Sequence, residues 1–211
     1  MNTAAIIAWF FAHLNYWTIA LLMAVESSFI PFPSEVVVPP AAWYSMTNDG
    51  LNIFLIIVVA TLGADVGALI NYYLAKWLGR PLVYKFADTR LSHMLLIDRE
   101  GVEKAEKYFR DHGVASTFFG RLIPGIRQLI SLPAGLAGMK MKPFLLYTTL
   151  GAALWNSVLA LIGYVIYRMY PDADLNKVKD LATEYNHELS MIILGLVALI
   201  VVFLIYKGVK K

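Results

Sequence analysis

Two apolar stretches of this sequence are interrupted by prolines, and these interruptions constrain the fold more than any other feature. Within a bilayer, backbone N–H and C=O groups must be satisfied inside the protein, so spanning segments are helices of about 20 apolar residues. The uninterrupted stretches at 51–78, 143–167 and 189–206 meet that requirement. With a first helix at 1–25, they predict an all-α integral membrane protein, a polytopic helical bundle with 59% hydrophobic residues. The sequence leaves open whether 1–25 is one span or a surface helix followed by a span.

The interrupted stretches lie at 26–46 and 113–139. A proline inside a helix removes a backbone hydrogen bond and collides with the preceding turn. Broken backbone is tolerated at membrane depth only where it is buried in protein or lines a wet cavity. Both stretches are therefore predicted to be re-entrant hairpins, and the following residues lie at their breaks: Pro31, Pro33, Pro124 and Gly125.

Charged residues outside the apolar stretches predict the topology. Lys140 precedes one span and Lys207 follows another, and the positive-inside rule places such bases, and with them the C-terminus, in the cytoplasm. The segment 80–112 carries both signs of charge and is predicted to be a cytoplasmic amphipathic segment, whereas 168–188 becomes an external loop. The two hairpins then enter from opposite sides. This indicates a single membrane domain over 1–211 with an inverted-repeat-like design, which transporters use to bind substrates on broken helices.

Four charged side chains near the two breaks form the candidate site, because a charge at bilayer depth costs about 2.5–3.5 kcal/mol and is usually functional. Arg121 and Arg127 are about 240° apart on an ideal helix, so the break between them is what lets both face one cavity. Glu26 and Glu35 flank the first break in the same way. Two guanidinium groups suit bidentate binding of a phosphate. Two close carboxylates cannot both ionise cheaply, which predicts a proton-coupling or pairing role for the glutamates.

These charged residues also have a structural interpretation. Glu–Arg pairs would hold the two hairpins together, although buried ion pairs stabilise a protein less than apolar packing does. A dual role combines both interpretations: the glutamates and arginines pair when the site is empty and rearrange when a substrate binds. Asp65, in the sequence GADVG, and Asn71 on the same predicted helix are supporting candidates. For Asp65 we leave open a buried polar contact to a hairpin backbone and a part in the site itself.

The sequence disfavours catalysis and bound cofactors. It contains no cysteine, and its four histidines lack the spacing of metal ligands. Ser27, Ser28 and Ser131 have no nearby histidine that would activate a nucleophile. We therefore expect neither enzyme activity nor a cofactor or metal. The net charge of +3 comes largely from the ends of spans and is a topology signal, so nucleic acid is not an expected partner.

The same residues resemble a known family. Together they cover most of the chain, and the arginine motif is the most specific of them. The motifs are E-x4-P-x-P-S-E at Glu26–Glu35, G-x-D and N-Y-x6-G-R within Gly63–Arg80, F-G-R-x2-P-x2-R at Phe119–Arg127, a proline–glycine run at Leu132–Gly138, and W-x7-G-Y at Trp155–Tyr164. In these motifs the chain resembles the DedA membrane proteins, relatives of eukaryotic VTT-domain lipid scramblases.

The resemblance implies a lipid-phosphate translocase of the bacterial inner membrane whose functional residues are the acidic pair and the arginine pair, with Arg80 in support. The expected function is a flippase for undecaprenyl phosphate. A flippase or scramblase for phospholipids such as phosphatidylethanolamine is the first alternative. A proton-coupled transporter of small ions, a lipid phosphatase and a structural assembly factor are the others. The expected partners are the lipid substrate and the bilayer, and assembly into a homo-oligomer is left open.

Overall fold

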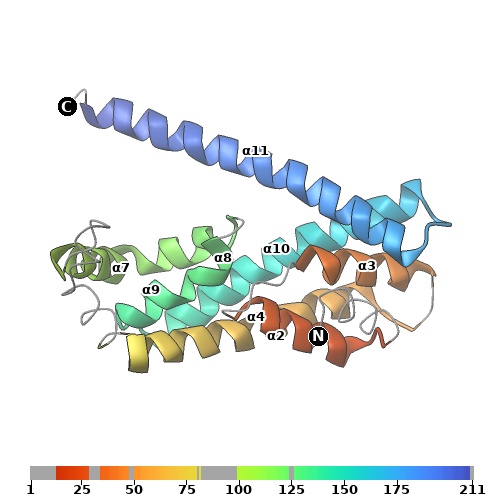
Figure 1. Ribbon diagram of the computed structural model, residues 1–211, viewed down its shortest axis with the longest axis horizontal. Coiled ribbons are helices and arrows are strands. Elements are labelled where there is room, and N and C mark those ends of the chain that lie inside the picture. The colour runs from red at the N-terminus through yellow and green to blue at the C-terminus, as the bar shows by residue number, and fades with distance from the viewer. Residues whose placement is uncertain are drawn as a thin grey trace.

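The computed structural model describes residues 13–28, 34–47, 50–79, 81, 99–123 and 126–209, and this part of the chain is all helical (Figure 1). The predicted all-α class is therefore confirmed. Its elements are α2 (Tyr16–Glu26), η1 (Ser34–Val36), α3 (Val38–Thr47), α4 (Ile53–Leu74), η2 (Ala75–Gly79), α7 (Arg99–Gly120), α8 (Ile126–Leu129), α9 (Ser131–Leu136), α10 (Met141–Met169) and α11 (Leu175–Val209).

Two helices of the described part are long and apolar enough to cross a bilayer. They are α4 continued by η2, over Ile53–Gly79, and α10, over Met141–Met169. They match the predicted spans 51–78 and 143–167. The two helices pack against each other, and α2 lies along α4 while α3 lies along α10.

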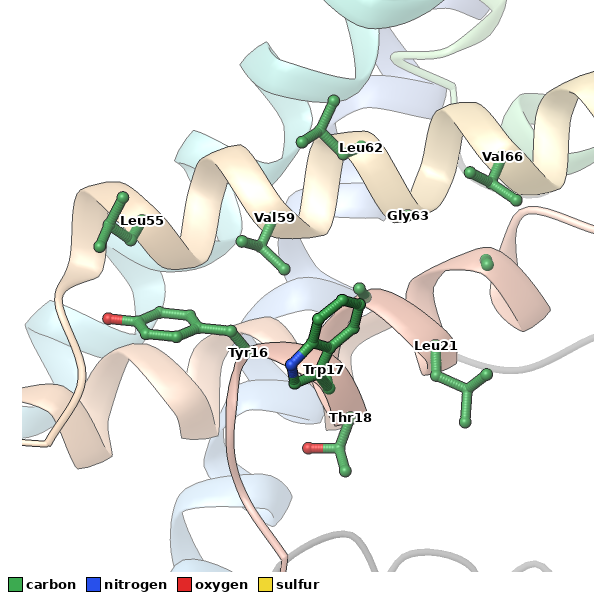
Figure 2. A pocket seen from close by; sticks show the side chains of 11 residues that line it. Tyr16, Trp17, Thr18, Leu21, Leu55, Val59, Leu62, Gly63 and Val66 are labelled. Carbon is green, nitrogen blue, oxygen red and sulfur yellow. The ribbon is translucent and has the colours of Figure 1, made fainter.

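The exposed surface of α4 is as apolar as its buried surface. Ala60 and Ala64 face the core, whereas Leu62 is 58% exposed and Val66 is 51% exposed. An apolar groove of about 890 Å³ runs between α2 and α4 on this exposed side, and Trp17 is among the residues that line it (Figure 2). Large exposed apolar patches are unusual on soluble monomers. This surface is suited to lipid.

Glycines let the broken segments lie directly on the spans. A Cβ atom on Gly63 of α4 would collide with the carbonyl oxygen of Ala20 on α2. A Cβ atom on Gly163 of α10 would collide with the carbonyl oxygen of Pro39 on α3. The helices on the two sides of the first interruption, α2 and α3, are therefore fixed on two different spans.

Each proline-broken stretch forms helices separated by an interruption. In the first, α2 ends at Glu26 and η1 begins at Ser34. In the second, α7 ends at Gly120 and α8 begins at Ile126. The helix α7 runs unbroken across the predicted boundary at 112/113, with Phe109 buried and the charged residues 110–112 exposed.

The segment 168–188 is mostly helical and is not the loop that the sequence predicted. The carboxylate of Asp174 accepts a hydrogen bond from the backbone N–H of Lys177 at 2.7 Å, which is the geometry of a helix N-cap. The helix α11 then continues through the predicted span 189–206, and its second half runs apart from the other helices (Figure 1).

The first predicted helix, 1–25, is also not continuous where it is described. Asn15 caps α2 by accepting hydrogen bonds from the backbone N–H groups of Trp17 and Thr18, so this helix begins at Tyr16. Residues 1–12 lie outside the described part of the chain.

Candidate functional site

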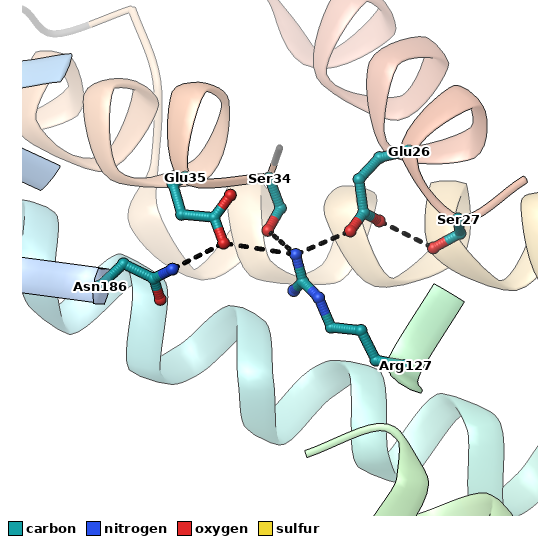
Figure 3. A network of polar contacts seen from close by, with 6 residues as sticks. All are labelled: Glu26, Ser27, Ser34, Glu35, Arg127 and Asn186. Carbon is teal, nitrogen blue, oxygen red and sulfur yellow. Dashed lines mark hydrogen bonds and ion pairs between the residues drawn. The ribbon is translucent and has the colours of Figure 1, made fainter. Parts of the chain in front are cut away.

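Arg127 lies at the centre of a buried polar cluster that joins the two helix interruptions (Figure 3). Its Nη2 atom is 2.8 Å from Glu26 Oε1 and 3.5 Å from Glu35 Oε1. The same atom donates a hydrogen bond to Ser34 Oγ at 2.6 Å. Glu26 comes from the end of α2, Ser34 and Glu35 come from η1, and Arg127 comes from α8. The structure thus brings both predicted glutamates to one arginine.

Further contacts fix the two main partners. Ser27 Oγ donates a hydrogen bond to Glu26 Oε2 at 2.9 Å. The guanidinium carbon of Arg127 lies 5.0 Å from the centre of the Trp155 ring on α10, within the range of a cation–π interaction. Both charged groups are buried, with Glu26 at 2% and Arg127 at 7% exposed. Ion pairs this deep in a protein are screened little by salt.

Arg121 follows the last turn of α7 and has a different partner. Its Nη2 atom donates a hydrogen bond to Ser131 Oγ at 3.2 Å. Glu26 and Asp65 attract it electrostatically, and Arg127 repels it. Its Nε atom is buried and finds no hydrogen-bond partner among the described residues.

The two arginines nevertheless share one cavity, of about 10 Å³, which is close to the least volume that holds a single water. The indole Nε1 of Trp155, another residue that lines the cavity, is also buried without a partner in the described part. The residues that line the cavity are Glu26, Ser27, Ala64, Arg121, Arg127, Ala152, Trp155 and Asn156. Unused N–H donors on the lining residues favour a ligand that supplies acceptor oxygens.

The supporting candidates on α4 lie beside this cluster. Asp65 accepts a hydrogen bond from the hydroxyl of Thr149 on α10 at 2.7 Å, so its partner is a side chain and not a hairpin backbone. The amide of Asn71 donates to the carbonyl oxygens of Ser27 at 3.1 Å and Gln128 at 3.2 Å. Asn71 therefore ties the residues next to both interruptions to the same span.

Some predicted positions cannot be placed, and some contacts were not predicted. The predicted supporting residues Pro31, Pro33, Arg80, Pro124 and Gly125 lie outside the described residues. Sequence reasoning missed Asn186 of α11, whose Nδ2 donates to Glu35 Oε1 at 2.7 Å. It also missed Ser34 and Trp155 as partners of Arg127. The four-residue spacing of Val178, Ala182 and Asn186 was the signal that would have found Asn186.

The cluster holds more acidic than basic groups. Glu26, Glu35 and Asp65 supply three carboxylates, and Arg121 and Arg127 supply two guanidinium groups. Within the described part, no group of histidine, aspartate and glutamate side chains is placed to hold a metal ion. The arrangement can therefore exchange one anion for another at the arginines, or take up a proton at a carboxylate.

Fold and site together define the class: a polytopic, all-helical membrane protein with a buried arginine–carboxylate cluster between two interrupted helices. Residues 30–165 match the family model described as the VTT domain. The chain thus belongs to the VTT-domain, or DedA, family of membrane proteins, as its motifs predicted. No solved structure is similar to it.

Several curated proteins are similar to this chain. An alkaline phosphatase-like protein of Lactococcus lactis subsp. lactis (strain IL1403) is 42% identical over 149 residues, which are 71% of this chain and 69% of that protein. Undecaprenyl phosphate transporter A of Staphylococcus aureus (strain NCTC 8325 / PS 47) is 30% identical over 158 residues, which are 75% of this chain and 77% of that protein. Protein DedA of Escherichia coli (strain K12) is 26% identical over 161 residues, which are 72% of this chain and 70% of that protein.

Proposed function

We propose that this protein is a membrane transporter that moves a phosphate-bearing lipid across the bacterial inner membrane. Undecaprenyl phosphate is the first candidate substrate, because the Staphylococcus aureus relative is named for its transport. A phospholipid such as phosphatidylethanolamine is the alternative. The hydrocarbon tail stays in the bilayer, so only the head group needs a polar path.

The observation that carries this proposal is the pair of buried arginines at one cavity, each near a carboxylate that an incoming phosphate can replace. Arg127 contacts Glu26 and Glu35, and Arg121 lies in the field of Glu26. Two oxygens of a phosphate can accept the paired N–H groups of a guanidinium fork, as the two oxygens of a carboxylate do. A cavity of about 10 Å³ is too small for a phosphate, so binding requires the two helix interruptions to separate.

The proposal includes the geometry that the sequence predicts for these interruptions. The stretches 26–46 and 113–139 are proposed to be re-entrant hairpins that enter the membrane from opposite sides. The contact between Glu26 and Arg127 supports a meeting of their tips, because each residue borders one interruption. In this arrangement the C-terminus lies in the cytoplasm.

Charge balance supports proton coupling. Three carboxylates already outnumber the two guanidinium groups of the cluster, so an incoming phosphate would add to an excess of negative charge. Like charges at close range disfavour ionisation, and protonation of Glu26 or Glu35 relieves the excess. The glutamates are therefore proposed to take up a proton as the phosphate binds.

The name of the Lactococcus relative raises the possibility of a phosphatase. A phosphatase needs a nucleophile or a metal-activated water. The hydroxyls next to the arginines are engaged: Ser27 with Glu26, Ser34 with Arg127, and Ser131 with Arg121. Transport explains these contacts better than hydrolysis.

The function is tested by reconstituting the full chain in liposomes. Fluorescent polyprenyl phosphate, labelled phosphatidylethanolamine and a neutral lipid alcohol are supplied separately, and flipping is measured by quenching with an impermeant reductant. We expect flipping above protein-free liposomes for at least one of the two phosphate-bearing lipids and none for the alcohol. Equal flipping of the alcohol contradicts phosphate recognition, and release of inorganic phosphate would indicate an enzyme.

A further inference from the structure

The carboxylate of Glu35 is shared between two partners of different strength. One oxygen, Oε1, accepts a hydrogen bond from Asn186 Nδ2 at 2.7 Å and lies 3.5 Å from Arg127 Nη2. Hydrogen bonds to carboxylates are usually 2.7–2.9 Å long, so the Asn186 contact is of full strength and the Arg127 contact is at the limit. Glu35 is therefore held more by Asn186 than by Arg127.

The position of Asn186 is set by the packing of α11. Val178 and Ala182 are fully buried and contact Trp43 of α3 and Ile166 of α10. Asn186 follows one turn later on the same face and is only 7% exposed. The indole of Trp43 also donates to the carbonyl oxygen of Tyr170, which fixes α3 to the turn between α10 and α11.

Beyond Asn186, α11 is only partly packed: Ile193 still contacts the hydrophobic core, while its neighbours face outward. Met191 and Ile192 are 58% and 60% exposed, and the second half of the helix diverges from the other elements (Figure 1). Asn186 is therefore a buried polar residue between the fully buried Ala182 and the partly buried Ile193. It also lies outside the family match, which ends at residue 165.

Asn186 has capacity that its contact with Glu35 does not use. Its Oδ1 atom is buried and finds no partner among the described residues. An unpaired buried acceptor costs free energy, which an apolar side chain at this position would avoid. What an apolar side chain could not supply is the amide N–H that donates to Glu35.

We propose that Asn186 is a positioning residue that holds Glu35 off Arg127, so that Arg127 can exchange its carboxylate partner for the phosphate of the lipid. The inference rests on the proposed function. When the phosphate arrives, Arg127 releases Glu35, and the carboxylate stays satisfied by Asn186. Without the amide, Arg127 is the remaining donor that the structure places at this oxygen, and the phosphate must compete with a tighter ion pair.

The test compares Asn186→Ala, Glu35→Gln and the double variant with the full wild-type chain. His187→Ala is the matched control, because the neighbouring His187 is exposed on the same helix. In detergent, Asn186→Ala should weaken binding of a fluorescent polyprenyl monophosphate roughly tenfold, which corresponds to the loss of one hydrogen bond to a charged group. In the Glu35→Gln background the same change should alter binding less than twofold, and His187→Ala should leave it unchanged.

Melting temperatures of the same variants, measured without lipid, separate this inference from the proposed function. The shifts in melting temperature caused by Asn186→Ala and Glu35→Gln should be non-additive. The double variant should be no less stable than the less stable of the two single variants. Additive shifts overturn the inference whether or not any lipid binds. If the shifts are non-additive but the protein binds no phosphate-bearing lipid, the coupling of Asn186 to Glu35 is supported and the proposed function is overturned. Unchanged or tighter lipid binding by a folded Asn186→Ala variant overturns the positioning role.

Discussion

One nitrogen of Arg127 makes most of the contacts that close the site. Nη2 carries two hydrogens, yet Glu26, Ser34 and Glu35 all lie within 3.5 Å of it. Three acceptors cannot all be satisfied by two hydrogens, and the contact with Glu35 is the longest. Nη2 therefore has more acceptors around it than it has hydrogens. The other N–H groups of the guanidinium can donate to a phosphate.

At the scale of single residues, replacement of Arg127 by lysine should weaken lipid binding at least about tenfold, because an ammonium group keeps the charge but loses the planar fork. Arg121→Lys should act in the same direction. The control is Arg168→Lys at the exposed end of α10, which should bind like wild type. Binding of a fluorescent polyprenyl phosphate to folded variants is the measurement, and full affinity in both site variants would exclude bidentate recognition.

The pair of Glu26 and Arg127 gives a second prediction at this scale. Glu26→Gln leaves the buried Arg127 with the more distant Glu35 as its carboxylate partner and should lower the free energy of unfolding by about 1–3 kcal/mol. Glu184→Gln, an exposed change on α11, should have little effect. Combining Glu26→Leu with Arg127→Met should restore much of the loss, because it removes both charges together. Denaturant titration in mixed micelles measures each variant, and a Glu26→Gln protein as stable as wild type would contradict the pairing.

At the scale of helices, the position of Glu26 depends on how closely α2 lies on α4. Gly63→Ala places a methyl group against the backbone of Ala20 and should cost about 1–3 kcal/mol of stability, because the obstacle is backbone and not a flexible side chain. Gly195→Ala is a matched helical control with open space around it, and it should be neutral or stabilising by up to about 1 kcal/mol. Thermal unfolding in detergent measures both, and equal stability of the two variants would contradict the close approach.

The helices show what local pattern can and cannot predict. The spans at α4 and α10 follow from the length of their apolar stretches, and the interruptions after Glu26 and Gly120 follow from prolines. The start of α11 was missed because its first half is dominated by charge. Its helical signal is a cap at Asp174 and a narrow stripe that begins with Val178 and Ala182. A narrow stripe among polar residues resembles a solvated loop until its packing partner is known.

At the scale of the whole molecule, the site joins elements that are distant in the sequence. Charges beside two breaks predicted that four side chains would meet, since neither arginine nor carboxylate is stable alone in an apolar interior. The pairing itself could not be predicted. Arg127 contacts both glutamates because α8 faces η1 and the end of α2. Arg121 contacts Ser131 because α9 lies beside it. Asn186 enters only because α11 folds back over α3 and α10.

The topology provides the last prediction, and it concerns the molecule as a whole. Opposed hairpins require the turn before α4 and the start of α11 to lie outside, and α7 to begin in the cytoplasm. The chain has no native cysteine, so single-cysteine variants report accessibility without background. In intact cells, cysteines at Gly50 and Asn176 should react with an impermeant maleimide, and a cysteine at Glu103 should react only after permeabilisation. Labelling of Asn176 and Glu103 from the same side would exclude opposed hairpins, since the stretch 113–139 would then have to cross the membrane completely instead of returning to the side from which it enters.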